Sequence, residues 1–245
     1  MRARDYFNTG TERPFVYVPR LVYLFLLVFL VGQVVLNHRL PDQRVEAQKL
    51  PDVPGSNVLD LAALGDRIAL SKYLMLWLQA FDNQPGISIP FRHLDYQRLR
   101  QWLDRILALD PRSDYPLLSA SRVYAEVADA ERKRIMLAFV SDKFREDPEK
   151  RWPWMAHAVY VAKHQLKDLD LALELATEIR ELVPPGMAPS WARQMEIFIL
   201  EDMDEIEAAM VLIGGLLESG EITDENELRF LKSRLEELEQ KRKSG

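Results

Sequence analysis

The chain contains no cysteine and little glycine, with 10 glycines in 245 residues. The absence of cysteine excludes disulfides, thiolate catalysis and cysteine-ligated zinc or iron–sulfur sites. Stretches in which β-branched and polar residues alternate are also scarce, whereas 48% of the residues are hydrophobic. This composition predicts an all-α protein that is large enough to bury a substantial core.

The sequence also lacks clusters of basic residues and the sequence motifs that are typical of enzymes. The formal net charge of −6 argues against the clustered positive surface that binds nucleic acid. The sequence has no phosphate-binding loop, dinucleotide fingerprint, nucleophile elbow or H-E-x-x-H motif. We therefore predict no catalytic residues, no cofactor, no metal site and no nucleic-acid partner, and we expect a binding protein rather than an enzyme.

One long apolar run, FVYVPRLVYLFLLVFLVGQVVL, extends from residue 15 to residue 36 and contains a single charge, Arg20. About 22 helical residues extend roughly 33 Å, which matches a bilayer hydrocarbon core of about 30 Å. The run is longer than the apolar region of a signal peptide, and no A-x-A-like cleavage site follows it. We predict an uncleaved transmembrane helix over residues 15–37.

The flanks of this segment indicate its orientation. A slight excess of arginine before the predicted span places residues 1–14 in the cytoplasm and the larger domain in the periplasm, anchored by a single pass in the inner membrane. Residues 38–57 contain three prolines and many polar groups. They predict a linker between the membrane and a folded domain.

Three proline pairs recur along the rest of the chain, with four residues between the members of each pair. They are Pro111 with Pro116, Pro148 with Pro153, and Pro184 with Pro189. Both members recur at intervals of 37 and 36 residues, a period typical of stacked helix pairs. Because proline lacks an amide hydrogen, we expect the first proline to end a helix and the second to begin the next. A small residue three positions after each second proline, at Ser119, Ala156 and Ala192, allows close packing of neighbouring helices.

Between these prolines, apolar residues repeat with the period of an amphipathic helix. The predicted helix pairs are 58–82 with 93–109, 116–127 with 131–146, 153–166 with 169–182, and 189–202 with 204–218. They form a predicted repeat domain over residues 58–222. A highly charged segment, 223–245, follows with Thr223 or Asp224 as its N-cap, and it predicts a capping helix whose outer side faces water.

The segments DLALELATEIRELVP (170–184) and RLRQWLDRILALDP (98–111) resemble tetratricopeptide repeats. Ala172 and Pro184 stand at the spacing of that family, although the period exceeds its usual 34 and Met136 replaces a small residue. The resemblance implies an α-solenoid of about four helix pairs whose first helices bind a protein or peptide. The positions that it implies for partner binding are Arg122, Glu126, Tyr160, Lys163, Arg193 and Glu196. Trp152, next to the charged Lys150 and Arg151, is a further candidate for an exposed binding residue.

Three other features allow more than one interpretation. His157 and His164 are seven positions apart on one predicted helix, which separates them by about 10 Å along its axis, too far for one metal ion. The acidic run LEDMDEIE (200–207) is interpreted as a helix junction with Asp204 as N-cap rather than as a cation site. The loop 81–93 carries the apolar stretch ISIP, which either packs on the domain or receives a partner chain.

The resemblance implies a membrane-anchored scaffold that assembles or stabilises a cell-envelope complex, such as secretion, pilus, cell-wall or respiratory machinery. Two alternatives remain open. One is a structural subunit that docks through its transmembrane helix, for which Gly32 and Gln33 are the evidence. The other is an envelope enzyme, which requires a coupled acid and base that the sequence does not reveal. The oligomeric state is left open.

Overall fold

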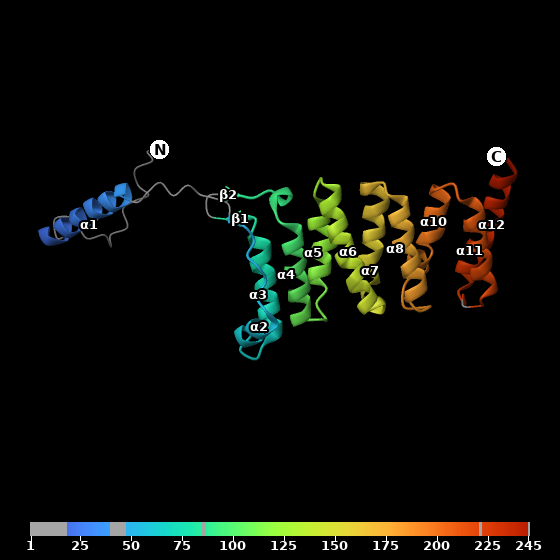
Figure 1. Ribbon diagram of the computed structural model, residues 1–245, viewed down its shortest axis with the longest axis horizontal. Coiled ribbons are helices and arrows are strands. Elements are labelled where there is room, and N and C mark those ends of the chain that lie inside the picture. The colour runs from blue at the N-terminus through green and yellow to red at the C-terminus, as the bar shows by residue number, and fades with distance from the viewer. Residues whose placement is uncertain (1–18, 40–47, 85–86, 221, 245) are drawn as a thin grey trace, which may run out of the picture. The chain divides into compact units, whose positions relative to one another are not determined.

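The computed structural model describes residues 19–39, 48–84, 87–220 and 222–244. The chain divides into two compact units, Met1–Glu46 and Ala47–Gly245. The described residues confirm the all-α class, because helices dominate and the strands among them form one short antiparallel hairpin (Figure 1).

The first unit contains helix α1, Arg20–Arg39. The predicted tail 1–14 and the start of the predicted span 15–37 lie outside the described residues. The apolar side chains between Leu21 and Leu36 are exposed on all sides of α1, with exposed fractions between 43% and 71%. Among the helices in the described ranges, none has the length and apolarity needed to cross a membrane.

The second unit consists of helices that follow one another side by side, with successive helices running in opposite directions (Figure 1). The α-helices are α2 (Ser56–Ala62), α3 (Arg67–Ala80), α4 (Tyr96–Leu109), α5 (Tyr115–Arg122), α6 (Ala130–Glu146), α7 (Pro148–Tyr160), α8 (Leu169–Leu182), α9 (Ser190–Arg193), α10 (Met195–Asp202), α11 (Ile206–Glu218) and α12 (Glu225–Ser244). The 3-10 turns η2 (Phe91–His93) and η3 (Tyr124–Glu126) precede α4 and follow α5, and the π-helical turn η4 (Val161–Leu166) continues α7. The strands are β1 (Asn83–Gln84) and β2 (Ile87–Ser88).

Aspartate side chains fix the beginnings of several helices. Asp95, Asp129 and Asp168 accept hydrogen bonds from backbone amides in the first turns of α4, α6 and α8. These bonds satisfy donors that have no partner inside the helix. Asp224 accepts hydrogen bonds in the same way at the start of α12. Of the two predicted N-cap residues, Thr223 and Asp224, the N-cap is therefore Asp224. The prediction of Asp204 as an N-cap is wrong, because Asp204 lies in the left-handed region with φ of 62° and α11 begins after Glu205.

The proline pairs mark the helix boundaries, with one correction. Pro116 lies in the first turn of α5, and Pro189 immediately precedes α9. At the middle junction the expectation is wrong, since Pro148 begins α7 and Pro153 lies inside that helix. Only Asp147 separates α6 from α7, so Pro148 occupies the first helical position, where its missing amide hydrogen leaves no acceptor unpaired.

Two helices predicted as continuous are interrupted. The predicted helix 58–82 divides into α2 and α3 at Leu64 and Gly65, whose φ angles of 49° and 92° are left-handed. Only glycine adopts such angles readily, so the sequence signal for this break is Gly65. The predicted helix 189–202 is interrupted at Gln194, between α9 and α10.

The segments around the α3–α4 connection are packed onto the helices. The hairpin β1–β2 and the turn η2 occupy the predicted loop 81–93, where Ile89 is buried and the ring of Phe91 meets that of Tyr124. Residues 48–55, counted in the predicted linker, lie against α4. There the guanidinium of Arg98 donates to the carbonyl of Leu50 at 2.6 Å, and the indole of Trp102 donates to the carbonyl of Pro51 at 2.9 Å.

The core of the second unit is continuous from the first helices to the last. One cluster of buried apolar side chains extends from Leu50 to Ile199, and it includes the small residues Ala156 and Ala192 predicted to sit between helices. A second cluster joins α10, α11 and α12 through residues such as Ile213 and Leu231. Every member of both clusters belongs to Ala47–Gly245, so this unit contains all the apolar packing that it needs to fold by itself.

Candidate partner-binding face

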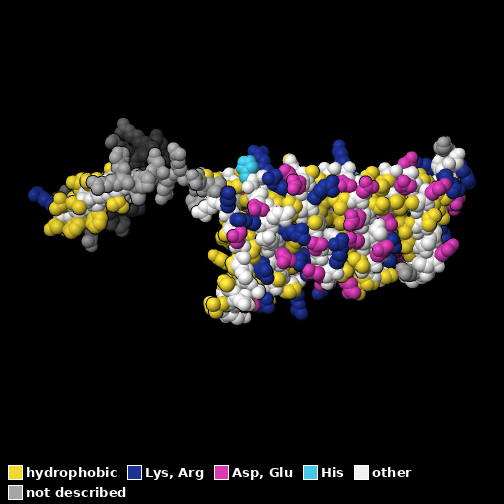
Figure 2. All heavy atoms as spheres, in the orientation of Figure 1, with side chains coloured by type: hydrophobic (Ala, Val, Ile, Leu, Met, Phe, Trp, Pro, Cys, Tyr) yellow, Lys and Arg dark blue, Asp and Glu magenta, His cyan; other side chains and the backbone are white. Residues whose placement is uncertain are grey.

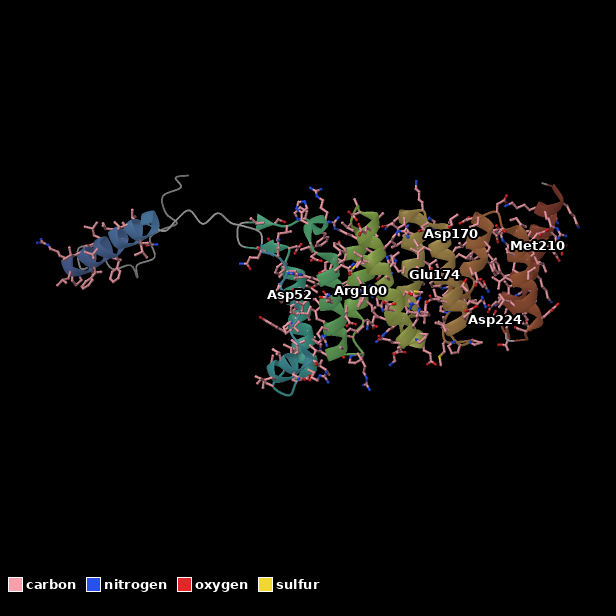
Figure 3. The ribbon with its side chains drawn as sticks, in the orientation of Figure 1. Asp52, Arg100, Asp170, Glu174, Met210 and Asp224 are labelled. Atoms are coloured by element: carbon pink, nitrogen blue, oxygen red, sulfur yellow. The ribbon has the colours of Figure 1, made fainter. Side chains whose placement is uncertain are left out.

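Ion pairs connect α4, α6 and α8, which are the second helices of the predicted pairs. Arg100 on α4 points toward α6 (Figure 3) and meets Asp142 at 2.5 Å. Lys143 on α6 contacts Asp104 on α4 at 2.5 Å, and Arg145 on α6 pairs with Glu178 on α8. These three ion pairs therefore connect successive helix pairs across α4, α6 and α8.

The first helices of the pairs, α5, α7 and α9–α10, carry a different set of side chains. On α7 and its continuation η4, Tyr160 lies between His157 and His164. The centroids of the Tyr160 and His157 rings are 5.7 Å apart with an angle of 19° between their planes, and those of Tyr160 and His164 are 4.8 Å apart. Tyr160 remains 49% exposed, so the middle ring of this ring stack is accessible from solvent.

The surroundings of His157 favour its neutral form. Burial lowers its pKa, the guanidinium of Arg122 lowers it further, and Glu126 acts in the opposite direction. Charging the imidazole would require desolvating a second cation next to Arg122. The backbone of Ser121 on α5 acts in the same direction as Glu126 and raises the pKa of His157.

Residues next to the ring stack connect three first helices. Gln165 on η4 donates to the carboxylate of Glu126 on η3 at 3.0 Å. Lys163 on η4 forms an ion pair with Asp202 at the end of α10. The structure therefore brings the predicted residues Arg122, Glu126 and Tyr160 together around His157, and it places Lys163 one turn further along.

Trp152, predicted as an exposed binding residue, lies near the start of α7 and is only half-buried. Its ring meets that of Trp191 edge-to-face, with the centroids 5.8 Å apart. Trp191 is 54% exposed and is the more accessible member of the pair. Trp152 is therefore less exposed than the sequence predicted, and the sequence did not single out Trp191 as the exposed residue.

The structure does not bring Arg193 and Glu196 to the ring stack. Glu196 is buried and accepts a hydrogen bond from Arg180 of α8 at 2.6 Å. Arg193 lines a cavity of about 650 Å³ between α8 and α11, with Leu182, Val211 and others. These two positions were implied by the resemblance to tetratricopeptide repeats, and the helix predicted to carry both is interrupted between them at Gln194.

From the sequence, His157 and His164 were interpreted as solvated or hydrogen-bonded side chains rather than as metal ligands, and their stacking with Tyr160 was not predicted. In the ranges that the structure describes, no group of three or more histidine, aspartate or glutamate side chains is placed to hold a metal ion. The signal for their actual arrangement is present in the sequence, because residues 157, 160 and 164 are spaced to share one helix face.

No family model, curated protein or solved structure matches the chain. Its function is therefore inferred from its own sequence and geometry.

Proposed function

We propose that the protein is a membrane-held scaffold with a tetratricopeptide-like repeat domain, and that its first helices bind a protein or peptide chain. The observation that carries this proposal is the accessible ring stack of His157, Tyr160 and His164 beside the exposed Arg122. The face formed by α4, α6 and α8 is a poorer candidate, because its charges are already engaged with one another.

The ring stack has the chemistry of a peptide-binding surface. Tyrosine and arginine are enriched among the residues that dominate protein interfaces, since they combine a large apolar area with directional hydrogen bonding. Tyr160 is fixed between two imidazoles and loses little side-chain freedom on binding. Arg122 adds a cation for a carboxylate of the partner. We infer an extended partner segment with an apolar or aromatic side chain next to an acidic one.

The membrane part of the proposal rests on the sequence of residues 15–37 and on the apolar side chains that α1 exposes on all sides. A helix that is apolar on all sides is typical of a membrane span or of the interior of a larger protein. We place it in the inner membrane, with the amino terminus in the cytoplasm and the repeat domain in the periplasm, where it assists assembly of an envelope complex.

The second candidate is a structural subunit that docks through α1. It is favoured by Gly32 and Gln33 within α1, since small and polar residues mediate contacts between helices in lipid. Replacing residues 15–36 with an unrelated anchor separates the two functions. A scaffold keeps its activity after this exchange, and a subunit that docks in lipid loses it.

The test of the scaffold function is a photo-crosslinking residue in place of Tyr160, in the full chain and in native membranes. We expect a discrete crosslinked product that disappears when Arg122→Glu is added. A crosslinker in place of Phe230 on α12, an aromatic residue that is 42% exposed, is the control for position. Arg112→Glu, a charge reversal at an exposed site outside the helices, is the control for charge. The proposal is wrong if position 160 gives no product, or if Arg112→Glu removes the product as fully as Arg122→Glu does.

A further inference from the structure

The amino-terminal end of the repeat domain exposes an apolar surface, the α2–α3 patch. It consists of Val58, Leu61, Leu64, Ile68, Tyr73 and Leu76, whose exposed fractions lie between 51% and 91%. Apolar side chains are visible over α2 and along the outer edge of α3 in Figure 2. Leu64 is the most exposed, at the turn where the chain passes from α2 into α3.

The patch lies on the outer side of helices whose inner side is already packed. Leu74, Met75 and Leu78 of α3 face the core, and Leu59 of α2 does the same. Ile68 and Leu76 of α3 are exposed, so they lie outside the part of α3 that packs on the core. A helix with apolar side chains on both sides is typical of the interior of a stack, where a further element covers the second side.

The charges around the patch nearly cancel. Asp60 and Arg67 form an ion pair at 3.2 Å, and Asp66 caps the first turn of α3 through the amide of Ala69. Lys72 is exposed between Ile68 and Leu76. Aliphatic side chains with one tyrosine and one lysine, and without strong net charge, match the headgroup boundary of a lipid bilayer, where tyrosine and the lysine stem are both accommodated.

The length of the connecting chain limits how far this end of the domain can lie from α1. Helix α1 ends at Arg39, and the described part of the repeat domain begins at Gln48, whose backbone amide donates to the side chain of Gln84 on β1. These positions are nine peptide units apart, so they are separated by at most about 30 Å. An α1 embedded in lipid therefore keeps the first helices of the repeat domain within reach of the bilayer surface.

We propose that the α2–α3 patch docks on the lipid bilayer, which takes the place of an amino-terminal capping helix. This inference rests on the proposed membrane location and is independent of peptide binding at Tyr160. Because the contact is apolar and the local charges cancel, uncharged phosphatidylcholine is sufficient as a partner and added salt does not weaken the contact.

The test uses the fragment of residues 48–245, which contains both core clusters. The chain has no cysteine, so Leu64→Cys provides a single position for an environment-sensitive fluorophore. We expect phosphatidylcholine vesicles to shift its emission to shorter wavelength and to raise its intensity several-fold. The matched control is the same label at Val211→Cys on α11, which is 77% exposed, and its emission should not change. Adding Leu61→Ser and Ile68→Ser should weaken vesicle binding at least tenfold, while circular dichroism verifies that the helices are retained.

Three results would overturn the proposal. They are an unchanged emission at position 64, binding only to anionic vesicles at low salt, and a shift that occurs without lipid and grows with protein concentration, which would mean that a second copy covers the patch. Sedimentation of the unlabelled fragment distinguishes the last case. None of these results affects the crosslink at Tyr160, so failure of lipid docking and failure of the scaffold function are distinguishable.

Discussion

The two ends of the repeat domain differ in what their outermost helices show to the surroundings. At the carboxyl end, α12 buries Leu231 and Leu238 against α10 and α11 and directs lysine, arginine and glutamate outward. At the amino end, α3 buries Leu74, Met75 and Leu78 and leaves Ile68 and Leu76 exposed. A stack of helices needs a polar end wherever it meets water. The comparison indicates that the two ends meet different surroundings.

The ends also differ in how their polar groups are paired. Arg234 on α12 makes an ion pair with Glu201 on α10, whose side chain is only 11% exposed. Glu227 accepts hydrogen bonds from Ser190 at 2.5 Å and from Gln194 at 2.7 Å. The ion pair of Arg67 and Asp60 at the amino end is more than half exposed on both sides. The carboxyl cap is thus fixed by partly buried polar bonds as well as by apolar packing.

The largest expected difference between the ends comes from truncating one leucine in each. Leu231→Ala removes a fully buried side chain, and we expect a loss of about 2–5 kcal/mol in the free energy of unfolding. Leu64→Ala removes one that is 91% exposed, and we expect a change within about 0.5 kcal/mol. Urea unfolding of the 48–245 fragment without lipid measures both. Equal losses at the two positions would mean that the amino end is covered by protein.

The ion pairs provide a comparison of intermediate size. Arg234→Ala leaves the mostly buried carboxylate of Glu201 without its partner, and we expect a loss of about 1–2 kcal/mol. Arg67→Ala breaks an exposed pair, and we expect less than about 0.5 kcal/mol. Thermal unfolding at low salt and at high salt checks this prediction. If high salt removes the effect of Arg234→Ala, the pair is exposed in solution and the carboxyl cap is looser than its contacts indicate.

The smallest effect is expected in the middle of the stack and depends on pH. The pKa of His157 is lowered in the folded protein, so the unfolded chain binds the proton more readily. The contribution of His157 to stability is therefore present above its unfolded pKa of about 6.5 and is lost as the pH falls below that value. The melting temperature of the unchanged protein should fall between about pH 7.5 and 5.5. In His157→Gln we expect this fall to be smaller by about 1–3 °C.

A matched change at His93 is the control, since that side chain is exposed near the amino end. The melting temperatures of His93→Gln and His157→Gln are compared at the same two pH values. An equal effect of both substitutions would show that the acid sensitivity is spread along the chain and does not arise from burial beside Arg122.

The sequence predicted the helices well wherever local signals agreed. The predicted helix 169–182 coincides with α8, because Asp168 caps its start and Val183 and Pro184 follow its end. The middle proline pair misled the prediction, since Pro148 and Pro153 each have the features of a helix start and only the one-residue turn at Asp147 selects the first.

The arrangement of the candidate site residues followed from the sequence only where the helices themselves were predicted correctly. Tyr160 and Arg122 lie on helices whose phase the sequence gives correctly, so they come together as expected. Glu196 lies beyond the interruption at Gln194, where its orientation is set by Arg180 of a neighbouring helix. Contacts across helices decide such positions, and no local pattern encodes them.

What the sequence determined by itself is the helical class, the approximate helix boundaries and the aspartate caps, because periodicity and capping act over a few neighbouring residues. Only the tertiary structure decided which charges pair across α4, α6 and α8, which ring of a stack stays open, and which end of the domain lacks a polar cover. Those properties depend on which helices become neighbours, and that follows from packing over the whole domain.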